Sequence, residues 1–321
     1  MNFTVDPWDP TYGASLDTEL GASSALIDPD VEVPAARWAP IDPMPVAPPA
    51  AVLFVDGVRR VDAQVWVSEE SAEQGQESAL ALCASYAAGV MCCCPERGAH
   101  LAVAEVRRGL VTTATDATDV VTTAGTYEAV PTSARADIAP MQVLSLALQR
   151  ALGEVELAAA ELARVGIEEP DDLLVVDGPL RGRAHLPRAI GFVKSHRSDY
   201  LPPQLGGVVA ELRAGQRTPV FALGTSWERH TWYLRLPGAP GTPWAGIVRV
   251  EAPAGPASVE LAARSQATLV RYASTEYKDS RAPQNLYPIG GLERALRRRL
   301  GEPAVLYRAL RRAAARATPV G

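Results

Sequence analysis

The chain has 321 residues, of which 47% are hydrophobic and 21% charged, with a formal net charge of −6. This composition is that of an ordinary soluble globular protein with room for one large domain or two modest ones, and the net charge gives no general reason to expect a polyanionic partner. The charge is uneven, however, because acids gather in the first fifty residues and arginines in the last thirty. Such a split permits a local basic surface on an acidic protein.

The chain begins without the basic region and apolar core of a secretory signal. Its longest uncharged stretch, residues 78–95, contains serine, tyrosine and glycine and falls short of the roughly 20 apolar residues that a membrane-spanning helix needs. We therefore expect a cytoplasmic protein that does not enter a membrane.

Proline and aspartate are frequent in residues 1–50, which predicts an extended N-terminal arm that lies over the fold or is partly disordered. Hydrophobic periodicity predicts the elements that follow. In chain order these are two strands over 51–69, strands over 79–94 and 99–114, a threonine-rich loop or edge over 112–133, a helix over about 140–165, a strand from Leu173, a short helix over 203–214, strands within 219–224, 231–237 and 244–253, and helices at about 256–273 and 290–316.

The order of these elements predicts the fold class. Several strands precede a helix and a further strand, and an acidic residue ends both the first strand and the strand after the helix. RNase H-like folds are laid out in this way, which is an analogy at the level of the fold. We therefore expect an α/β fold, an RNase H-like mixed sheet flanked by helices, with the extended arm at its N-terminus.

Two segments of the same form carry candidate site residues: "AVLFVDGVRR" (residues 51–60) and "LLVVDGPL" (residues 173–180). Asp56 and Asp177 each stand at the carboxyl end of a hydrophobic strand, where ligands bind in open α/β sheets. If the strands are neighbours, carboxylates about 4 Å apart repel by about 4 kcal/mol at an effective dielectric constant of about 20, unless a cation lies between them or one keeps its proton. Oxygen ligands favour Mg²⁺ or Mn²⁺ over zinc.

The competing interpretation is that Asp-Gly is a common turn signal and that each acid only makes local hydrogen bonds. Two such units in one chain, separated by a helix that can supply a third acid, favour the metal site. On that helix, Glu154 lies at the edge of the apolar stripe and Glu156 lies farther into solvent. We therefore expect Glu154 to be the third acid.

Basic residues follow another apolar run, in "IGFVKSHRSDY". Lys194 is a candidate for neutralising a phosphate oxygen or holding a carboxylate, although a surface lysine gives the same pattern. His196 and Arg197 are further candidate phosphate contacts. The remaining histidines are isolated in sequence and are expected to be structural: His100, His185 and His230.

The four cysteines are Cys83, Cys92, Cys93 and Cys94. Three adjacent thiols do not have the paired spacing of zinc ligands, and no histidine follows at a zinc-finger interval. We expect small buried hydrophobic side chains in a reducing compartment, with metal binding or redox sensing as the alternative.

Six segments, taken in this order, resemble the NurA nuclease family from Ala51 to the C-terminus: "AVLFVDGVRR", "LQRALGEVELAAAELA", "LLVVDGPLRG", "IGFVKSHRSDYLP", "WAGIVRVEAP" and "QNLYPIGGLERAL". NurA proteins have an RNase H-like core, form dimers and are Mn²⁺-dependent 5′-to-3′ exonucleases and single-strand endonucleases. They act with the hexameric translocase HerA in resecting broken DNA ends. The resemblance implies a nuclease domain over residues 51–321, a Mn²⁺ (or Mg²⁺) cofactor, a homodimer and a HerA-like ATPase partner.

By this resemblance, Asp56, Glu154 and Asp177 are the metal-binding acids and Lys194 is the family's lysine. The chain departs from the family at Val58 and Pro179, where serine is usual, and at Leu296, where the family has an active-site histidine. Glu293 and Arg294 are near that position, but the pattern does not make either of them a replacement. The missing histidine favours weak or altered activity.

The primary hypothesis is therefore a metal-dependent DNA nuclease. Basic side chains are expected to contact backbone phosphates without sequence preference, namely Arg59, Arg60, Lys194, His196, Arg197, Arg294 and Arg298. The alternative from another class is a non-catalytic NurA-like subunit that binds a HerA-like ring and guides DNA. A third hypothesis is another RNase H-like phosphotransfer enzyme, such as an RNase H or a transposase-type nuclease.

Overall fold

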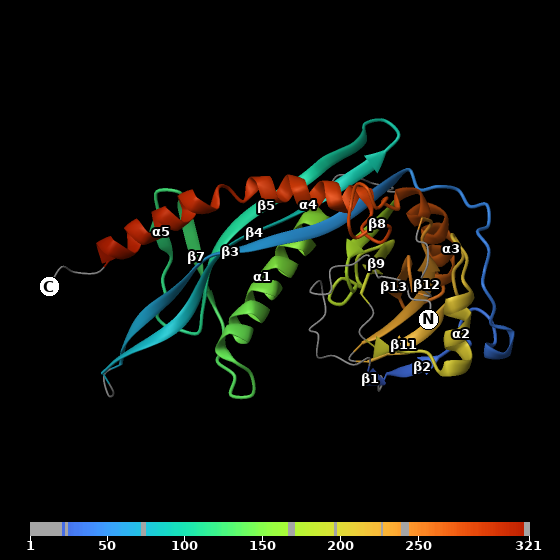
Figure 1. The fold of residues 1–321 in the computed structure, drawn as a ribbon, viewed down its shortest axis with the longest axis horizontal. Coiled ribbons are helices and arrows are strands. Elements are labelled where there is room, and N and C mark those ends of the chain that lie inside the picture. Colours follow the sequence, from blue (N-terminus) through green and yellow to red (C-terminus); the bar gives the residue numbers. More distant parts are fainter. Residues whose placement is uncertain are drawn as a thin grey trace, which may run out of the picture. The chain divides into compact units, whose positions relative to one another are not determined.

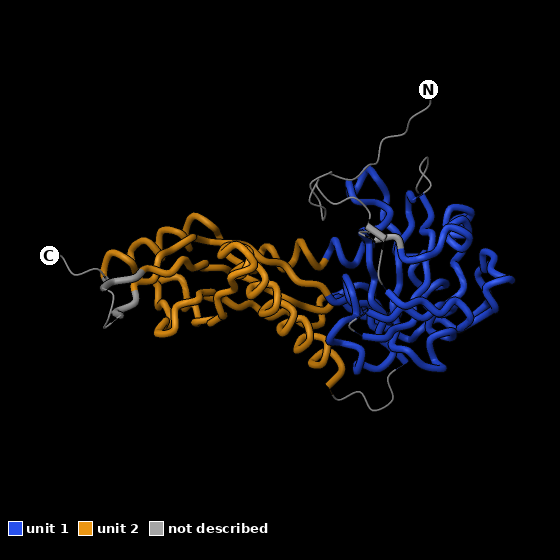
Figure 2. The backbone as a smooth tube through the Cα atoms, turned by 90° about the horizontal axis from the view of Figure 1, so that it is seen from below, with its two compact units in different colours: residues 1–55, 91–100, 166–291 blue, residues 56–90, 101–165, 292–321 orange. Residues whose placement is uncertain are grey.

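The computed structural model describes residues 21–22, 25–71, 75–165, 171–195, 198–225, 227–238 and 244–317. The chain divides into two compact units, which Figure 2 draws in different colours. Unit 1 comprises residues 1–55, 91–100 and 166–291, and unit 2 comprises residues 56–90, 101–165 and 292–321. The strand β3 (Ala51–Ser71) and the helix α4 (Tyr287–Arg299) contribute residues to both.

Unit 1 is built on a mixed sheet (Figure 1). The strands β3, β8 and β9 run parallel, and the pairs β9–β13, β13–β12, β12–β11 and β11–β2 are antiparallel. The strand order is β2 (Leu26–Asp28), β11 (Phe221–Gly224), β12 (Glu228–Arg235), β13 (Ile247–Pro253), β9 (Ala189–Val193), β8 (Asp172–Asp177) and the start of β3. A separate parallel pair is formed by β1 (Gly21–Ala22) and β10 (Ser198–Asp199).

Helices pack on both faces of this sheet, which explains why β8 and β9 are apolar along most of their length. On one face, Phe54 and Val175 lie in a core that α3 and the start of α4 complete. On the other face, Phe221 lies in a core with α2. The helical segments are η1 (Ala35–Arg37), α2 (Pro203–Glu211), α3 (Ser258–Leu269) and η2 (Val270–Tyr272).

Part of the N-terminal arm packs on unit 1. β2 pairs with β11, and the ring centroid of Trp38 lies 5.7 Å from that of Phe221. Arg217, which is almost fully buried, pairs with Glu32 at 2.7 Å. Residues of the acidic arm are thus held by strand pairing, a ring contact and an ion pair.

Unit 2 continues β3 and places helices on both faces of its strands. Side chains of β4 alternate between these helices, because Leu82 packs against α1 whereas Cys83 packs in the cluster that contains Leu310 of α5. In sheet order the further strands are β4 (Gly75–Cys94), β5 (Gly98–Thr112), β7 (Gly125–Pro131) and β6 (Val120–Thr122), and the helices are α1 (Pro140–Leu162) and α5 (Pro303–Ala317).

The structure is a mixed α/β sheet flanked by helices, as the sequence predicts, and it departs from the expected elements in places. β3 is one strand where the sequence predicts two. The threonine-rich stretch forms β6 and β7 at the edge of the sheet. The helix expected over 290–316 is broken, because Gly301 adopts a φ of +84° and Pro303 begins the next helix.

None of the helices among the described residues is both long enough and apolar enough to cross a membrane.

Candidate metal centre

The register of two parallel strands brings Asp56 and Asp177 to the same place. Phe54 of β3 pairs with Val175 of β8, so the residues two positions further along are these aspartates. Residues two apart on a strand point to the same face. Both aspartates therefore follow the core residues Phe54 and Val175 on the face under α3 and α4, at the point where the ladder of β3 and β8 ends.

The helix α4 supplies a further carboxylate. Glu293 follows the fully buried Ile289 by about one helical turn, so its side chain lies on the buried side of the helix. Carboxylate oxygens of Asp56, Asp177 and Glu293 all lie within 4.8 Å of one another. The sequence signal that could single out Glu293 is an acid within the apolar stripe of a helix.

Lys194 comes from the end of β9, the strand next to β8. Its Nζ donates to Asp177 Oδ2 at 2.6 Å and to Asn285 Oδ1 at 3.1 Å. Asn285 in turn donates from Nδ2 to Asp279 Oδ2 at 2.6 Å, which fixes the orientation of its amide. This chain of contacts holds the ammonium group against one oxygen of Asp177.

Asp279, the last member of this chain, stays ionised. Burial by itself raises the pKa of its carboxyl, but the hydrogen bonds from Asn285 and the Arg281 backbone and the charge of Arg281 outweigh burial and lower the pKa. An ionised Asp279 accepts from the Asn285 amide and leaves the Asn285 oxygen to face Lys194.

The helix α1 buries a different glutamate from the one that the sequence predicts to lie near the core. The expectation that Glu154 lies nearer the core than Glu156 is wrong, because Glu154 is exposed and Glu156 is 7% exposed. A Cβ on Gly57 would lie 2.5 Å from Glu156 Oε1 and 2.7 Å from Leu152 Cδ1. The buried carboxyl of Glu156 therefore lies against the residue that follows Asp56.

The segment after Asp177 turns towards β9, because the Gly178 backbone N–H donates to the Phe192 carbonyl at 2.8 Å. Gly178 adopts a φ of +104°, a conformation that favours glycine. Two residues later, the Leu180 backbone N–H donates to Glu251 Oε2 at 3.1 Å, and the buried Glu251 also accepts from Arg229 Nε at 2.8 Å. These hydrogen bonds hold the segment beside β9 and β13.

The donor set fits a hard divalent cation. Oxygen atoms of carboxylates are the ligands that Mg²⁺ and Mn²⁺ prefer. Within the described part of the chain, Asp177 Oδ1 is buried and accepts no hydrogen bond, so it is available as a ligand while Oδ2 is bonded to Lys194. A cation also offsets the repulsion of carboxylates held this close.

The predicted phosphate contacts are placed unequally. Arg294 and Arg298 are exposed on α4, and Arg59 is exposed with its Nη1 2.5 Å from Gln149 Oε1. Arg60 instead pairs with the buried Asp62 at 2.8 Å and donates to a backbone carbonyl, so it is a structural contact within unit 2. The other two predicted contacts, His196 and Arg197, lie outside the described residues.

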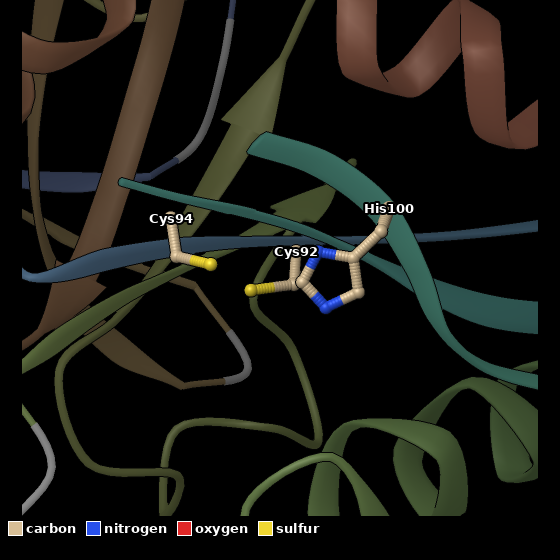
Figure 3. Close-up of side chains that lie close together, drawn as sticks. All are labelled: Cys92, Cys94 and His100. Carbon is tan, nitrogen blue, oxygen red and sulfur yellow. The ribbon is translucent and has the colours of Figure 1, made fainter. Parts of the chain in front are cut away.

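The cysteines follow the expectation of buried side chains only in part. Burial, and then the charge of Asp62, raise the pKa of the Cys83 thiol to about 12, which makes it a poor nucleophile. His100 is isolated in sequence but not in space, because its ring, Cys92 Sγ and Cys94 Sγ lie within 4.8 Å of one another (Figure 3). The turn between β4 and β5 brings these residues together although they are not at a zinc-finger spacing.

Comparisons with known proteins find a likeness among solved structures. The sequence matches no protein-family model and no curated protein. Among solved structures, the chain is similar to the NurA nuclease from Sulfolobus solfataricus, with 10% sequence identity, a TM-score of 0.42, and coverage of 82% of this chain and 84% of that one. At this identity and TM-score, the likeness does not assign the chain to a family.

Proposed function

We propose that this protein is a metal-dependent DNA nuclease of the NurA type with an RNase H-like core. The observation that carries the proposal is the approach of the Asp56, Asp177 and Glu293 oxygens to within 4.8 Å of one another, at the carboxyl end of a parallel strand pair. The sheet order β5-β4-β3-β8-β9, with α1 between β5 and β8 in the chain, agrees with the layout expected of such a core.

Each side chain has a stated role in this proposal. Asp56, Asp177 and Glu293 hold Mn²⁺ or Mg²⁺, which when bound lowers the pKa of a water molecule and stabilises the charge that builds on a scissile phosphate. Lys194 donates to one oxygen of Asp177 and, in this proposal, would offer its positive charge to the scissile phosphate. Glu156, buried behind Gly57, takes the role that the sequence gives to Glu154.

The substrate and partners in this proposal come from the sequence resemblance. DNA would be held through its phosphates by exposed arginines such as Arg59, Arg294 and Arg298, so that binding weakens steeply with salt. A homodimer that acts with a HerA-like hexameric ATPase on DNA ends completes the proposal.

The proposal is tested by cleavage of labelled single-stranded DNA with Mn²⁺, using Asp56→Asn and Asp177→Asn variants. We expect each to lose at least about 100-fold in rate, because several kcal/mol of transition-state stabilisation depend on the metal. Asp137→Asn, an exposed acid paired with Arg135, is the matched control and keeps full activity. Unchanged rates in both site variants contradict the nuclease. Preference for an RNA–DNA hybrid over DNA supports an RNase H-type enzyme instead.

One observation favours the alternative of a non-catalytic subunit that binds a HerA-like ring and guides DNA. Leu296, at the position of the family histidine, is fully buried, and its Cδ2 lies 3.2 Å from where a Cβ on Gly89 would be. The side chain is therefore part of the unit 2 core and presents no proton-transfer group. If this alternative is right, the purified chain cleaves neither single-stranded nor duplex DNA with Mn²⁺ or Mg²⁺, yet still binds the ring.

A further inference from the structure

A second donor cluster lies at the end of the β4–β5 hairpin in unit 1. β4 ends at Cys94 and β5 begins at Gly98, so the chain reverses within three residues. Counting outward from this turn, His100 stands opposite Cys92 on the neighbouring strand. Cys92 and Cys94 are two residues apart on one strand and point to the same face.

The face of the sheet to which Cys92 and Cys94 point is opposite to the face that carries Asp56 and Asp177. Met91 and Cys93 pack against the core that contains Phe54 and Val175, beneath α3 and α4. Because strand side chains alternate, Cys92 and Cys94 point to the other side of the sheet. The thiol cluster is therefore a separate site and does not share ligands with the acids.

The three donor atoms need little movement to bind one ion. They lie within 4.8 Å of one another, and Figure 3 shows the two sulfur atoms and the imidazole ring gathered at one spot. Two zinc–sulfur bonds of about 2.3 Å at a tetrahedral angle put the sulfur atoms about 3.8 Å apart, so a closure of about 1 Å by side-chain rotation is enough. Cys92 is buried, whereas Cys94 and His100 are half-buried, which leaves one side open to a solvent ligand.

We propose that Cys92, Cys94 and His100 form a Zn²⁺ site with a solvent molecule as fourth ligand. Thiolate and imidazole donors select zinc or Cu⁺ over the Mg²⁺ and Mn²⁺ that carboxylates prefer. A disulfide between the cysteines is disfavoured, since Cα atoms two residues apart on a strand are about 6.7 Å apart, at the upper limit of disulfide geometry. Bound zinc would tie β4 to β5 beside the hairpin turn and stabilise the folded chain.

Cobalt is the probe that separates this site from the acids. Co²⁺ held by thiolates gives an intense thiolate-to-cobalt absorption band, whereas Co²⁺ held by carboxylates gives none. We expect the reduced full-length chain to bind one Co²⁺ with this band, and Zn²⁺ to displace it. Zn²⁺ should also raise the midpoint of thermal unfolding.

Matched variants make the assignment specific. Cys94→Ser and His100→Gln should each weaken Zn²⁺ binding at least about 10-fold and reduce or shift the cobalt band, because each removes one ligand. Cys93→Ser removes a neighbouring thiol on the opposite face and should leave the band unchanged. Asp177→Asn, which alters the acidic site, should also leave it unchanged.

The proposal is overturned by the absence of the thiolate band in the reduced wild-type chain. It is also overturned by a band that is the same in His100→Gln as in wild type, or by loss of the band in Cys93→Ser with the fold intact by circular dichroism. His100 is half-buried and makes its ring contact with the Gly98 carbonyl at 3.2 Å, so its substitution by glutamine leaves the core untouched and keeps the test decisive if Cys94→Ser fails to fold.

Discussion

The two Asp-Gly pairs, Asp56-Gly57 and Asp177-Gly178, are alike in sequence but need glycine for different reasons. Gly178 adopts a φ of +104°, and a Cβ there would meet no atom within 4 Å. Gly57 lies inside β3, and a Cβ there would lie 2.5 Å from the Glu156 carboxyl. Gly178 is required by the backbone conformation, and Gly57 is required by the space that a buried acid occupies.

This difference shows that the shared dipeptide does not mark a shared turn. The chain turns after Asp177, whereas β3 runs on through Asp56 as far as Ser71. What the pairs have in common is the position of the aspartate in the register of β3 and β8, two residues beyond the paired Phe54 and Val175. The two aspartates are the candidate metal ligands. The glycine after each aspartate meets a separate requirement of the local structure.

Of the substitutions that test the difference between the two glycines, Gly57→Ala is expected to change the free energy of unfolding most. The new methyl group must displace the buried side chains of Glu156 and Leu152, so we expect the free energy of unfolding to fall by about 2–3 kcal/mol. Urea unfolding of wild type and variant measures the change. A loss below about 0.5 kcal/mol would mean that Gly57 is not required by space.

The next largest effect is expected from a change of Glu156, the buried acid of α1. Glu156→Gln keeps the shape of the buried side chain but removes its charge, and we expect Mn²⁺-dependent cleavage to slow about 10-fold, a change of about 1.4 kcal/mol. Glu154→Gln, on the exposed side of the same helix, is the matched control and should cleave at the wild-type rate. A larger loss of cleavage rate in Glu154→Gln than in Glu156→Gln would show that Glu154 is the functional acid, as the sequence predicts.

The smallest effect is expected from Gly178→Ala. The methyl group meets open space, so the cost is only that of placing alanine at a positive φ, about 1 kcal/mol. Thermal or urea unfolding detects this change, and the variant should bind Mn²⁺ like wild type. If Gly178→Ala destabilises the protein more than Gly57→Ala, the two glycines have been assigned the wrong roles.

Much of the fold follows from local sequence patterns. The parallel strand β8 and the helix α1 have clear periodicities, and the aspartates stand out because each ends an apolar run. The apolar stripe of α4 marks Glu293 as an acid on the buried side of its helix, but the stripe does not place it beside the aspartates, because that depends on how α4 packs on the sheet. The prediction of Glu154 places the centre of the apolar stripe wrongly, because the buried row of α1 runs through Leu148, Leu152 and Ala160 and therefore includes Glu156.

The cysteine and histidine cluster is missed for a related reason. Sequence spacing favours zinc ligands in paired motifs, whereas Cys92, Cys94 and His100 are brought together by strand alternation and a tight turn. Counting residues outward from the turn at 95–97 would find His100 once both strands are known.

The most direct test of the central claim is a calorimetric titration of the reduced full-length chain with Mn²⁺. The claim is that Asp56, Asp177 and Glu293 together hold a divalent cation. It predicts saturable Mn²⁺ binding that is lost in Asp177→Asn and in Glu293→Gln and is kept in Glu154→Gln. Binding of equal strength in all of these variants, or no binding above the surface background in wild type, would contradict it.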